Sequence, residues 1–518
     1  HGRRPRRRRA AARSHRLPGG GPDRRRGGEG SFTFGAATAA AQIEDMNDAA
    51  DWWVWTRPEA EGGLGNGTFV GEAVRGFSRQ VEDVGLVREI GLDAYRFNPS
   101  WARIEPERDA VDEDALDHYG EVLDALVEAG VKPMLTVHHF SSPTWVDDPL
   151  REETDCEGDP SDADLCGWHH PTGADAIIEE LAEHARLLAE RYGDRVDEWC
   201  TLNEPINYLL ASYGLQIFPP GRNLLLTRFD DFIAVVRNYI RAHVAVYEAI
   251  KEADTIDADG DGVAAHVGYT LSVAEWIPSR RGRVSDDPAD VEAAEKVEYV
   301  YHYVFTDALL NGELDSDLDQ EPDEEHPDWE GKLDFLGVQY YFRTGVTSDP
   351  GLVPVLEVTP CFGAFDLGSC VDPEDPTKWV PTMRYEYWEP GIYEVLVDFG
   401  ERYPDLPLTV TESGIAAEEG RRRAEHVVRN LEQIWRAREE GVDVRGYYHW
   451  SLMDNFEWAE GYEPRFGLYR VDLETYERTA TEGATVLRDL IAARAMSTEL
   501  RQEYGGLGPM TPEVGPEE

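Results

Sequence analysis

Two glutamates follow directly on apolar runs that have the pattern of buried strands. Glu204 lies in the stretch WCTLNEP at residues 199–205, and Glu412 lies in LPLTVTES at residues 406–413. A strand end often carries a solvated glutamate with no chemical role, so either residue alone would be weak evidence. Two carboxylates on one face, with no cysteine cluster or Ser–His pair beside them, can divide proton donation and nucleophilic attack between them. Whether they meet depends on the elements that position them.

A short apolar strand, a polar loop and an amphipathic helix recur along the chain. Helices with an apolar period of about 3.6 residues are predicted at 114–130, 176–193 and 424–441. Eight such units predict an α/β fold, a single closed (β/α)8 TIM barrel with loop insertions at its C-terminal face. An open doubly wound sheet is the alternative, but no glycine fingerprint for a dinucleotide follows the first strand. The strands are predicted at 31–38, 92–99, 132–139, 196–203, 263–270, 333–341, 406–413 and 445–452.

In such a barrel, the residues that follow the strands gather on the C-terminal face, where active sites lie. Seven of the eight predicted strands end in polar or aromatic side chains: Gln42 and Glu44, Arg96, His138 and His139, Asn203 and Glu204, Tyr340 and Tyr341, Glu412, and Trp450 with Glu457 and Trp458. Trp offers an apolar face to a sugar ring, and His, Asn and Gln offer partners for its hydroxyl groups. Paired carboxylates cleave glycosidic bonds without a metal, so we expect a carbohydrate-active site that needs no metal or cofactor.

At these positions the chain resembles glycoside hydrolase family 1, the retaining β-glycosidases. The stretches FTFGAATAAAQIE, YRFNPSWARIEP, TVHHFSSPTW, TLNEP, FLGVQYY, TESG, WSLMDNFEW and RFGLYRVD occur in the order of the family and span residues 31–495. The resemblance implies an exo-acting enzyme whose partner is a β-glycoside or oligosaccharide substrate. It would hydrolyse terminal β-D-glucosides, and β-D-galactosides or fucosides, through a covalent glycosyl-enzyme intermediate.

The resemblance also implies a role for each residue of the site. Glu204 would be the general acid/base, and Glu412 would be the nucleophile. Arg96 and Tyr341 would hydrogen-bond Glu412, keeping it ionised and aimed at the sugar. The substrate-binding residues would be Asn203 at the sugar 2-hydroxyl, Gln42, His139, Glu457 and Trp458 at the outer hydroxyls, and Trp450 as the stacking floor.

The chain departs from the family pattern at two positions. Phe140 stands where many members have Trp after the histidine, which removes one indole donor. Gln339 replaces the usual Asn before two tyrosines, which leaves a contact near the outer (+1) sugar site open. His138 is expected to be a packed histidine behind the site. Polar insertions at 151–167 and 349–379 are expected to rim the mouth, and the sequence does not define what they select.

A catalytically silent sugar-binding protein on the same barrel is the alternative function. Silent members usually lose one of the two glutamates, whereas Glu204 and Glu412 both stand in intact motifs. A 6-phospho-glycosidase would need cationic or hydroxyl partners for a phosphate after the eighth strand. Glu457 stands there and would repel a phosphate, so this alternative is disfavoured.

The chain is strongly acidic and poor in lysine. Its 518 residues include 102 Asp+Glu against 50 Lys+Arg, a formal net charge of −52. The lysines are Lys132, Lys251, Lys296, Lys332 and Lys378. Such a surface stays hydrated in concentrated salt, which predicts a halophilic enzyme, and an acidic mesophilic enzyme is the alternative. The charge repels nucleic acid and anionic membranes, and the sequence has no apolar run long enough to predict a membrane span.

Residues 1–30 differ from the rest of the chain because they hold 11 Arg among many Gly and Pro. A nucleic-acid-binding arm or a twin-arginine export signal would have this composition, but no apolar segment follows it. We therefore expect a disordered, non-native segment and a cytoplasmic enzyme. The predicted domains are 1–30 as this Arg/Gly-rich segment, 31–495 as the catalytic barrel and 496–518 as a C-terminal tail. We also expect that the enzyme can form a homo-oligomer.

Five cysteines are too few for a disulfide scaffold of this length. Cys200 lies in a predicted strand and is expected to be a buried free thiol. Cys156 with Cys166, and Cys361 with Cys370, could each close a loop in a polar insertion. A reducing cytosol nevertheless makes free thiols the expectation for all of them.

Two stretches resemble metal sites in part. A zinc site could be formed by Cys156, Cys166, His169 and His170, but their spacing matches no strong ligand pattern. The stretch DADGDG at residues 257–262 has the opening of a calcium loop. Position 12 of that loop falls on Gly268, where a bidentate Glu would be required. An acidic turn before the fifth strand is the preferred interpretation.

Overall fold

The structure is a computed structural model that describes residues 15–16, 31–151, 156, 160–361 and 366–513. Most of the predicted disordered segment, residues 1–30, therefore lies outside the described residues. Within that segment, the short strand β1 (His15–Arg16) pairs antiparallel with β18 (Ala495–Met496).

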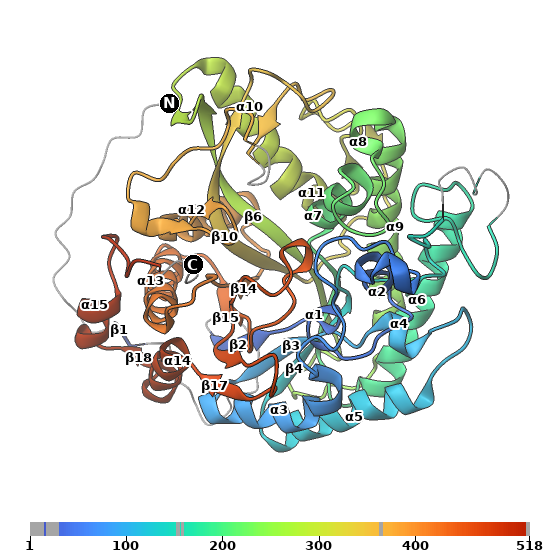
Figure 1. The fold of residues 1–518 in the computed structure, drawn as a ribbon, viewed down its shortest axis with the longest axis horizontal. Coiled ribbons are helices and arrows are strands. Elements are labelled where there is room, and N and C mark those ends of the chain that lie inside the picture. Colours follow the sequence, from blue (N-terminus) through green and yellow to red (C-terminus); the bar gives the residue numbers. More distant parts are fainter. Residues whose placement is uncertain (1–14, 17–30, 152–155, 157–159, 362–365, 514–518) are drawn as a thin grey trace.

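Eight parallel strands form a closed barrel at the centre of the molecule (Figure 1). They are β2 (Thr33–Ala37), β3 (Ala94–Phe97), β4 (Lys132–His138), β5 (Glu198–Asn203), β6 (His266–Arg280), β10 (Phe335–Thr347), β14 (Leu408–Ser413) and β15 (Val444–Trp450). Each pairs in parallel with the next, and the barrel closes where β15 pairs with β2, for example Tyr447 with Phe34. Each strand overlaps the residues predicted for it, so the TIM-barrel prediction is confirmed.

Helices fill the connections between the strands and cover the outside of the barrel (Figure 1). The long ones are α3 (Gly76–Ile90), α5 (Glu113–Glu128), α6 (Gly173–Tyr192), α9 (Phe229–Ala253), α10 (Pro288–Glu298), α11 (Val304–Asn311), α12 (Glu389–Arg402), α13 (Gly420–Glu439) and α14 (Glu482–Ala493). Shorter helices are α1 (Ala40–Ile43), α2 (Asp51–Thr56), α4 (Trp101–Ile104), α7 (Pro205–Leu209), α8 (Leu224–Thr227) and α15 (Thr498–Tyr504). The three helices predicted from periodicity correspond to α5, α6 and α13.

Helix α5 illustrates how the local sequence sets an element. The side chain of Asp112 accepts the N–H of Ala115 at 3.0 Å, which caps the first turn. Leu116, Leu123 and Leu126 then recur on one face and are buried against the barrel. Such capped, one-sided helices hold the strands in place, and the strands in turn position the residues at their ends.

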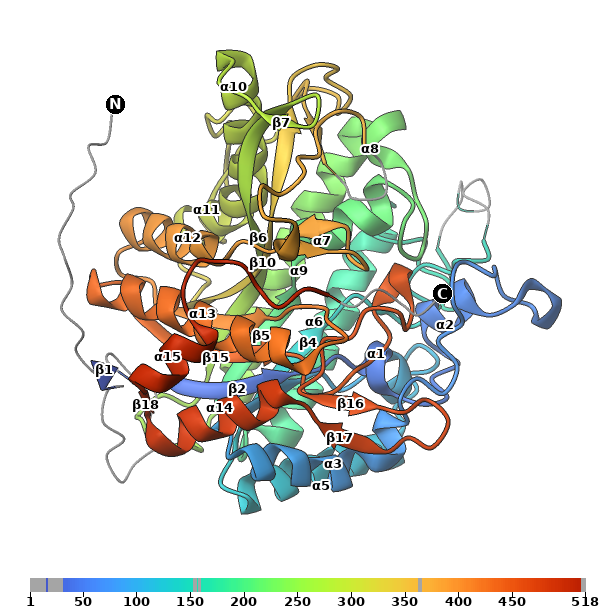
Figure 2. The same cartoon turned by 60° about the vertical axis from the view of Figure 1, so that its left-hand side comes forward.

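Strands β6 and β10 are 15 and 13 residues long and continue past the barrel as a parallel ribbon (Figure 2). Short strands extend this ribbon, namely β7 (Arg283–Val284), β11 (Thr359–Pro360), β12 (Trp379–Val380) and β13 (Tyr385–Glu386). Of these, β11 lies within the insertion predicted at 349–379, β12 begins at its end, and β7 and β13 lie outside it. The hairpin of β12 and β13 joins the ribbon where Arg343 pairs with Glu386. Separate small pairs are β8 (Glu313–Leu314) with β9 (Glu324–Glu325), and β16 (Tyr469–Val471) with β17 (Arg478–Ala480).

The cysteines differ in part from expectation. Cys156 is joined to Cys166, and Cys361 to Cys370, so the expectation of free thiols at these four positions is wrong. Each pair lies within one inserted loop, whose folding brings the two sulfurs together. Cys200 is a buried free thiol, as predicted. The zinc site, already disfavoured by its ligand spacing, would need Cys156 and Cys166 as thiolates, and these two sulfurs are bonded to each other.

The acidic stretch at residues 257–262 forms a turn before β6. The carboxylate of Asp257 accepts the N–H groups of Gly260 and Gly262 at 2.7 and 3.0 Å, and Asp261 bonds to the imidazole of His266 at 2.9 Å. This agrees with the interpretation as a turn. Among the described helices, none combines the length and the apolarity needed to cross a bilayer.

Candidate active site

The loops at the C-terminal ends of the strands enclose a pocket of about 780 Å³, counting its open mouth. Eight of the ten predicted site residues line it: His139, Asn203, Glu204, Tyr341, Glu412, Trp450, Glu457 and Trp458. The other two, Gln42 and Arg96, are fully buried directly behind this lining. The barrel therefore brings together residues that are up to 416 positions apart in the chain, from Gln42 to Trp458.

Glu204 sits at the turn from β5 into α7. Its backbone φ of 43° lies in the left-handed region, which turns the residue out of the strand direction, and its N–H donates to the carbonyl of Thr270 at 2.8 Å. Its carboxylate accepts a bond from the side-chain amide of Asn207, at 2.7 Å, and the side chain of Ser272 also bonds to it. Burial, together with the negative charge of Glu412, raises the pKa of Glu204 to about 8. At neutral pH this carboxyl therefore holds a proton that it can donate.

Glu412 lies within β14 and has different partners. The guanidinium of Arg96 donates to its Oε1 at 2.5 Å, and the hydroxyl of Tyr341 donates to its Oε2 at 2.7 Å. Burial raises the pKa of Glu412, while the charge of Arg96 and both hydrogen bonds act in the opposite direction. Of the two carboxyls, Glu412 is hydrogen-bonded to the guanidinium of Arg96, whereas Glu204 is hydrogen-bonded to no cation among the described residues. The shared proton therefore resides on Glu204, and Glu412 is the ionised partner.

Asn203 is oriented by three donors to its side-chain oxygen. They are Arg96 at 2.7 Å, Thr270 at 2.8 Å and Gln339 at 2.9 Å. Because the oxygen is occupied, the amide nitrogen is the group that Asn203 can offer to the pocket. Gln339 is fully buried behind the lining, so it supports Asn203 and does not stand at an outer sugar site.

The rest of the lining offers aromatic faces and unused polar atoms. The ring of His139 lies nearly parallel to those of Trp450 and Trp458, with centroids 6.0 and 5.9 Å away. Burial holds the pKa of His139 well below its usual value, so the ring is neutral, and its Nδ1 has no hydrogen bond within the described residues. The amide of Gln42 donates to Glu457 at 3.3 Å, while its Oε1 is likewise unused. Hydroxyl groups of a sugar could satisfy these atoms.

Glu457 is a third carboxyl in the wall of the pocket, and it is half-buried. Burial raises its pKa to about 8, and the nearby charges of Glu460 and Glu412 add to this effect. His138 lies behind the site, where its imidazole bonds to Ser142 at 3.0 Å and to Tyr239 at 2.8 Å. Both ring nitrogens are used, in agreement with the expected packing role.

Sequence reasoning missed several pocket residues, namely Asn207, Phe218, Ser272, Tyr301, Phe342, Met383, Tyr385, Glu460 and Phe466. Asn207 could have been found, because it stands one helical turn after Glu204 at the start of α7. Met383 and Tyr385 belong to the hairpin of β12 and β13, and no local pattern places an inserted hairpin over a pocket. Tyr301 lies in a short π-helical segment, Tyr299–Tyr303, that begins where α10 ends.

Comparison with known proteins agrees with this geometry. The profile of Glycosyl hydrolase family 1 matches residues 29–496. A β-galactosidase of Pyrococcus woesei is 29% identical, covering 91% of this chain and 98% of its own. A 1,4-β-D-glucan glucohydrolase of Thermotoga neapolitana is 30% identical, covering 86% of this chain and 98% of its own. The solved structure of a β-glycosidase from Pyrococcus horikoshii, 28% identical, superposes with a TM-score of 0.74 over 91% of this chain and 96% of that one. The chain therefore belongs to glycosyl hydrolase family 1 and is a retaining β-glycosidase.

Proposed function

We propose that the enzyme removes terminal β-D-glucosyl groups and also accepts β-D-galactosides and fucosides, with Glu412 as nucleophile and Glu204 as general acid/base. The unequal surroundings of the two carboxyls are the observation that carries these roles: Glu412 is bonded by a guanidinium, whereas the side chains of Asn207 and Ser272 that bond Glu204 are neutral. The names of the two relatives, a galactosidase and a glucan glucohydrolase, support both kinds of sugar.

In the first step, Glu204 donates its proton to the glycosidic oxygen while a carboxylate oxygen of Glu412 attacks the anomeric carbon. The bond from that carbon to the leaving oxygen breaks, and the leaving group departs as an alcohol. The products are a glycosyl ester on Glu412 and an ionised Glu204. The pKa of about 8 fits Glu204 for this donation at neutral pH.

In the second step, water takes the place of the leaving group. The carboxylate of Glu204 accepts a proton from this water, whose oxygen attacks the anomeric carbon and displaces Glu412. Each step inverts the configuration at carbon, so the sugar is released with the configuration of the substrate. Arg96 and Tyr341 stabilise Glu412 again as a free carboxylate.

Substrate binding is assigned to the remaining predicted residues. The amide nitrogen of Asn203 would donate to the sugar 2-hydroxyl beside Glu412. Trp450 would support the apolar face of the ring. The outer hydroxyls would bind at the unused atoms of Gln42 and His139, and at Glu457 and Trp458.

Proton NMR of the first product tests this proposal. With a β-D-glucoside as substrate, the β-anomer of glucose should appear first and then mutarotate, whereas an α-anomer as first product would contradict double displacement. A panel of nitrophenyl β-glycosides would rank the accepted sugars. An absence of turnover across the whole panel would instead favour the silent sugar-binding alternative.

We further propose that the enzyme is halophilic, because its excess of acidic side chains and its five lysines suit hydration in concentrated salt. The predicted domain limits and the capacity to form a homo-oligomer are also proposals.

A cytoplasmic location remains a prediction, and the two disulfides weigh against it, since disulfides persist mainly in oxidising compartments. Thiol counting on protein isolated from its native cell fractions would decide the location.

A further inference from the structure

Beyond α15, the described part of the C-terminal tail is residues 505–513. It leaves α15 and runs back over α13, as Figure 2 shows in dark red. There it meets residues 376–378, the 3-10 turn that leads into the hairpin of β12 and β13. Met510 is buried at this contact. The tail and the turn that leads into the hairpin are thus neighbours, although their contacts join residues 129 and 133 positions apart in sequence.

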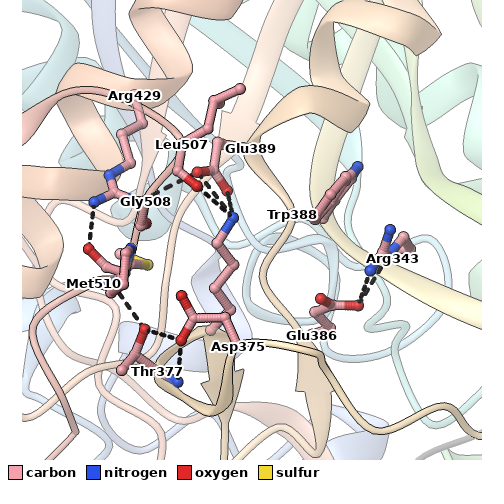
Figure 3. A network of polar contacts seen from close by, with 12 residues as sticks. Arg343, Asp375, Thr377, Glu386, Trp388, Glu389, Arg429, Leu507, Gly508 and Met510 are labelled. Carbon is pink, nitrogen blue, oxygen red and sulfur yellow. Dashed lines mark hydrogen bonds and ion pairs between the residues drawn. The ribbon is translucent and has the colours of Figure 1, made fainter.

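Buried cations hold the tail through its backbone carbonyls (Figure 3). Arg429 of α13 donates to the carbonyls of Gly508 at 2.7 Å and Pro509 at 3.0 Å. Lys378 donates to the carbonyl of Leu507 at 3.3 Å. Both cations also contact the buried carboxylate of Glu389, at 3.2 and 3.1 Å. One carboxylate cannot satisfy two buried cations, so the tail carbonyls complete their hydrogen bonding.

A second set of contacts ties the same stretch of tail to the start of the hairpin. Arg422 donates to the carbonyls of Thr377 and Trp379, both at 2.7 Å, and to that of Thr511 at 3.2 Å. The N–H of Met510 donates to the hydroxyl of Thr377 at 2.9 Å. Without the tail, these buried groups would lose partners and β12 would lose its support on this side.

The opposite side of the hairpin is held by β10. Arg343 makes two bonds to the carboxylate of Glu386, at 2.8 and 2.6 Å, and its guanidinium lies 3.7 Å from the ring centroid of Trp388 (Figure 3). The ring of Phe342 stacks on that of Tyr385, with centroids 4.9 Å apart. The hairpin is therefore clamped between the barrel ribbon and the tail.

The hairpin forms part of the pocket wall, through Met383 and Tyr385. Both side chains are half-buried and Arg384 between them is exposed, whereas Glu412 and Trp450 are buried deeper in the pocket. The hairpin thus belongs to the outer part of the wall. In an exo-acting enzyme the terminal sugar occupies the deep part, and the leaving group projects outward past the hairpin.

We propose that residues 507–511 of the tail are a positioning element for the leaving group: they fix the hairpin whose Met383 and Tyr385 face that part of the substrate. The tail touches neither the sugar nor the reacting carboxyls. Loss of the clamp should therefore impair the first step of the reaction, in which the leaving group is present. It should spare the second step, in which the leaving group has gone. This division rests on the double-displacement mechanism proposed above.

Two variants test the clamp. The first ends the chain after Gly506, and the second is Lys378→Met, which removes the ammonium that bonds Leu507 and Glu389. Lys332→Met is the matched control, because Lys332 makes an ion pair with the exposed carboxylate of Glu248, at 2.8 Å. If the truncated chain fails to fold, Lys378→Met decides the outcome.

For each variant, kcat/KM would be measured on a glucosyl disaccharide and compared with the deglycosylation rate from a dinitrophenyl β-glucoside. We expect kcat/KM on the disaccharide to fall by about 10- to 100-fold, the cost of misplacing a substrate by about 1 Å, with an unchanged deglycosylation rate. Equal losses in both steps, or no loss in either, would overturn the proposal. Failure of the catalytic assignment would appear separately, as an α-anomer released first by the unmodified enzyme.

Discussion

The ends of β5 and β14 present the same side chain to one pocket but hold it in different ways. Glu412 lies within β14, between a guanidinium and a phenol hydroxyl. Glu204 lies just beyond β5, where its own φ is 43°, and it is bonded by the neutral side chains of Asn207 and Ser272. A fixed, charge-paired carboxylate suits attack on carbon, and a desolvated one suits proton transfer. Environment, and not residue type, separates the two roles.

Removing the nucleophile, Glu412, should have the largest effect on turnover. Glu412→Gly leaves no group to form the ester, so turnover should fall by about 10⁴- to 10⁶-fold, the scale at which catalytic nucleophiles act. Azide should restore activity by entering the space of the lost side chain, and the product should be an α-glycosyl azide. The measurement is product analysis by NMR with and without azide. A β-configured azide product would assign the nucleophile elsewhere.

Removing the acid should have a smaller and more selective effect. Glu204→Gln cannot donate a proton, and general acid catalysis contributes about 10²- to 10⁴-fold on substrates with poor leaving groups. Dinitrophenyl glycosides need little protonation, so their glycosylation step should be largely spared. The rates on alkyl and dinitrophenyl glycosides are the readout. If Glu204→Gln and Glu412→Gly lose activity equally on every substrate, the two roles are wrongly assigned.

A smaller effect is expected on the pKa of Glu204 when its partner Asn207 is changed. The protonated form of Glu204 is active, so kcat/KM should fall as pH rises through its pKa of about 8. The amide of Asn207 lowers this pKa by bonding to the ionised form, and Asn207→Ala should move the alkaline limb to higher pH. The shift should be at most about 1 unit, since such a bond contributes about 1 kcal/mol. A pH profile with an unmoved alkaline limb would mean that another group controls it.

These two regions were also the most predictable from sequence. Strands such as 196–203 and 406–413 are short apolar runs, and each places its glutamate by local geometry alone. The mutual positions of the strands follow from barrel closure, so the strand-end residues meet without any further information. The contact between Asn207 and Glu204 was not predicted, but it is local in sequence, since Asn207 stands one helical turn after Glu204.

The inserted regions were not predictable, for a physical reason. The hairpin that carries Tyr385 is held by Arg343, and the turn that leads into it contacts Met510 of the tail, far away in sequence. No periodicity encodes such contacts. The pairing of Cys361 with Cys370 likewise depends on how one loop folds back on itself. The sequence left open whether a contact near the outer (+1) sugar site is kept at Gln339, because the burial of this residue behind Asn203 is a property of the closed barrel. Long-range packing therefore decides the positions of the hairpin and of Gln339, while the fold of a single loop decides the disulfide.

Salt should affect the stability of the acidic protein surface much more than the chemistry of the two buried glutamates. Its effect on the turnover number is the smallest effect that we predict. Without residues 1–30, the chain has 39 basic and 100 acidic side chains, a net charge of −61. The Debye length is about 30 Å at 0.01 M salt, so these charges repel one another across the barrel, and it shrinks to about 3 Å at 1 M. Added salt should therefore raise the melting temperature. Glu204 and Glu412 are buried, so the turnover number of the folded enzyme should change much less.

Melting temperature and turnover number, measured from low to multimolar NaCl and KCl, test this separation. A melting temperature that stays flat or falls between about 0.05 and 1 M salt would contradict the halophilic proposal, because screening must relieve repulsion over that range. The catalytic assignment would stand, since it rests on the contacts of Arg96 and Asn207 and not on surface charge. If turnover instead followed the melting temperature, the pocket would not be insulated from the surface. The pKa difference between the two glutamates would then depend on salt.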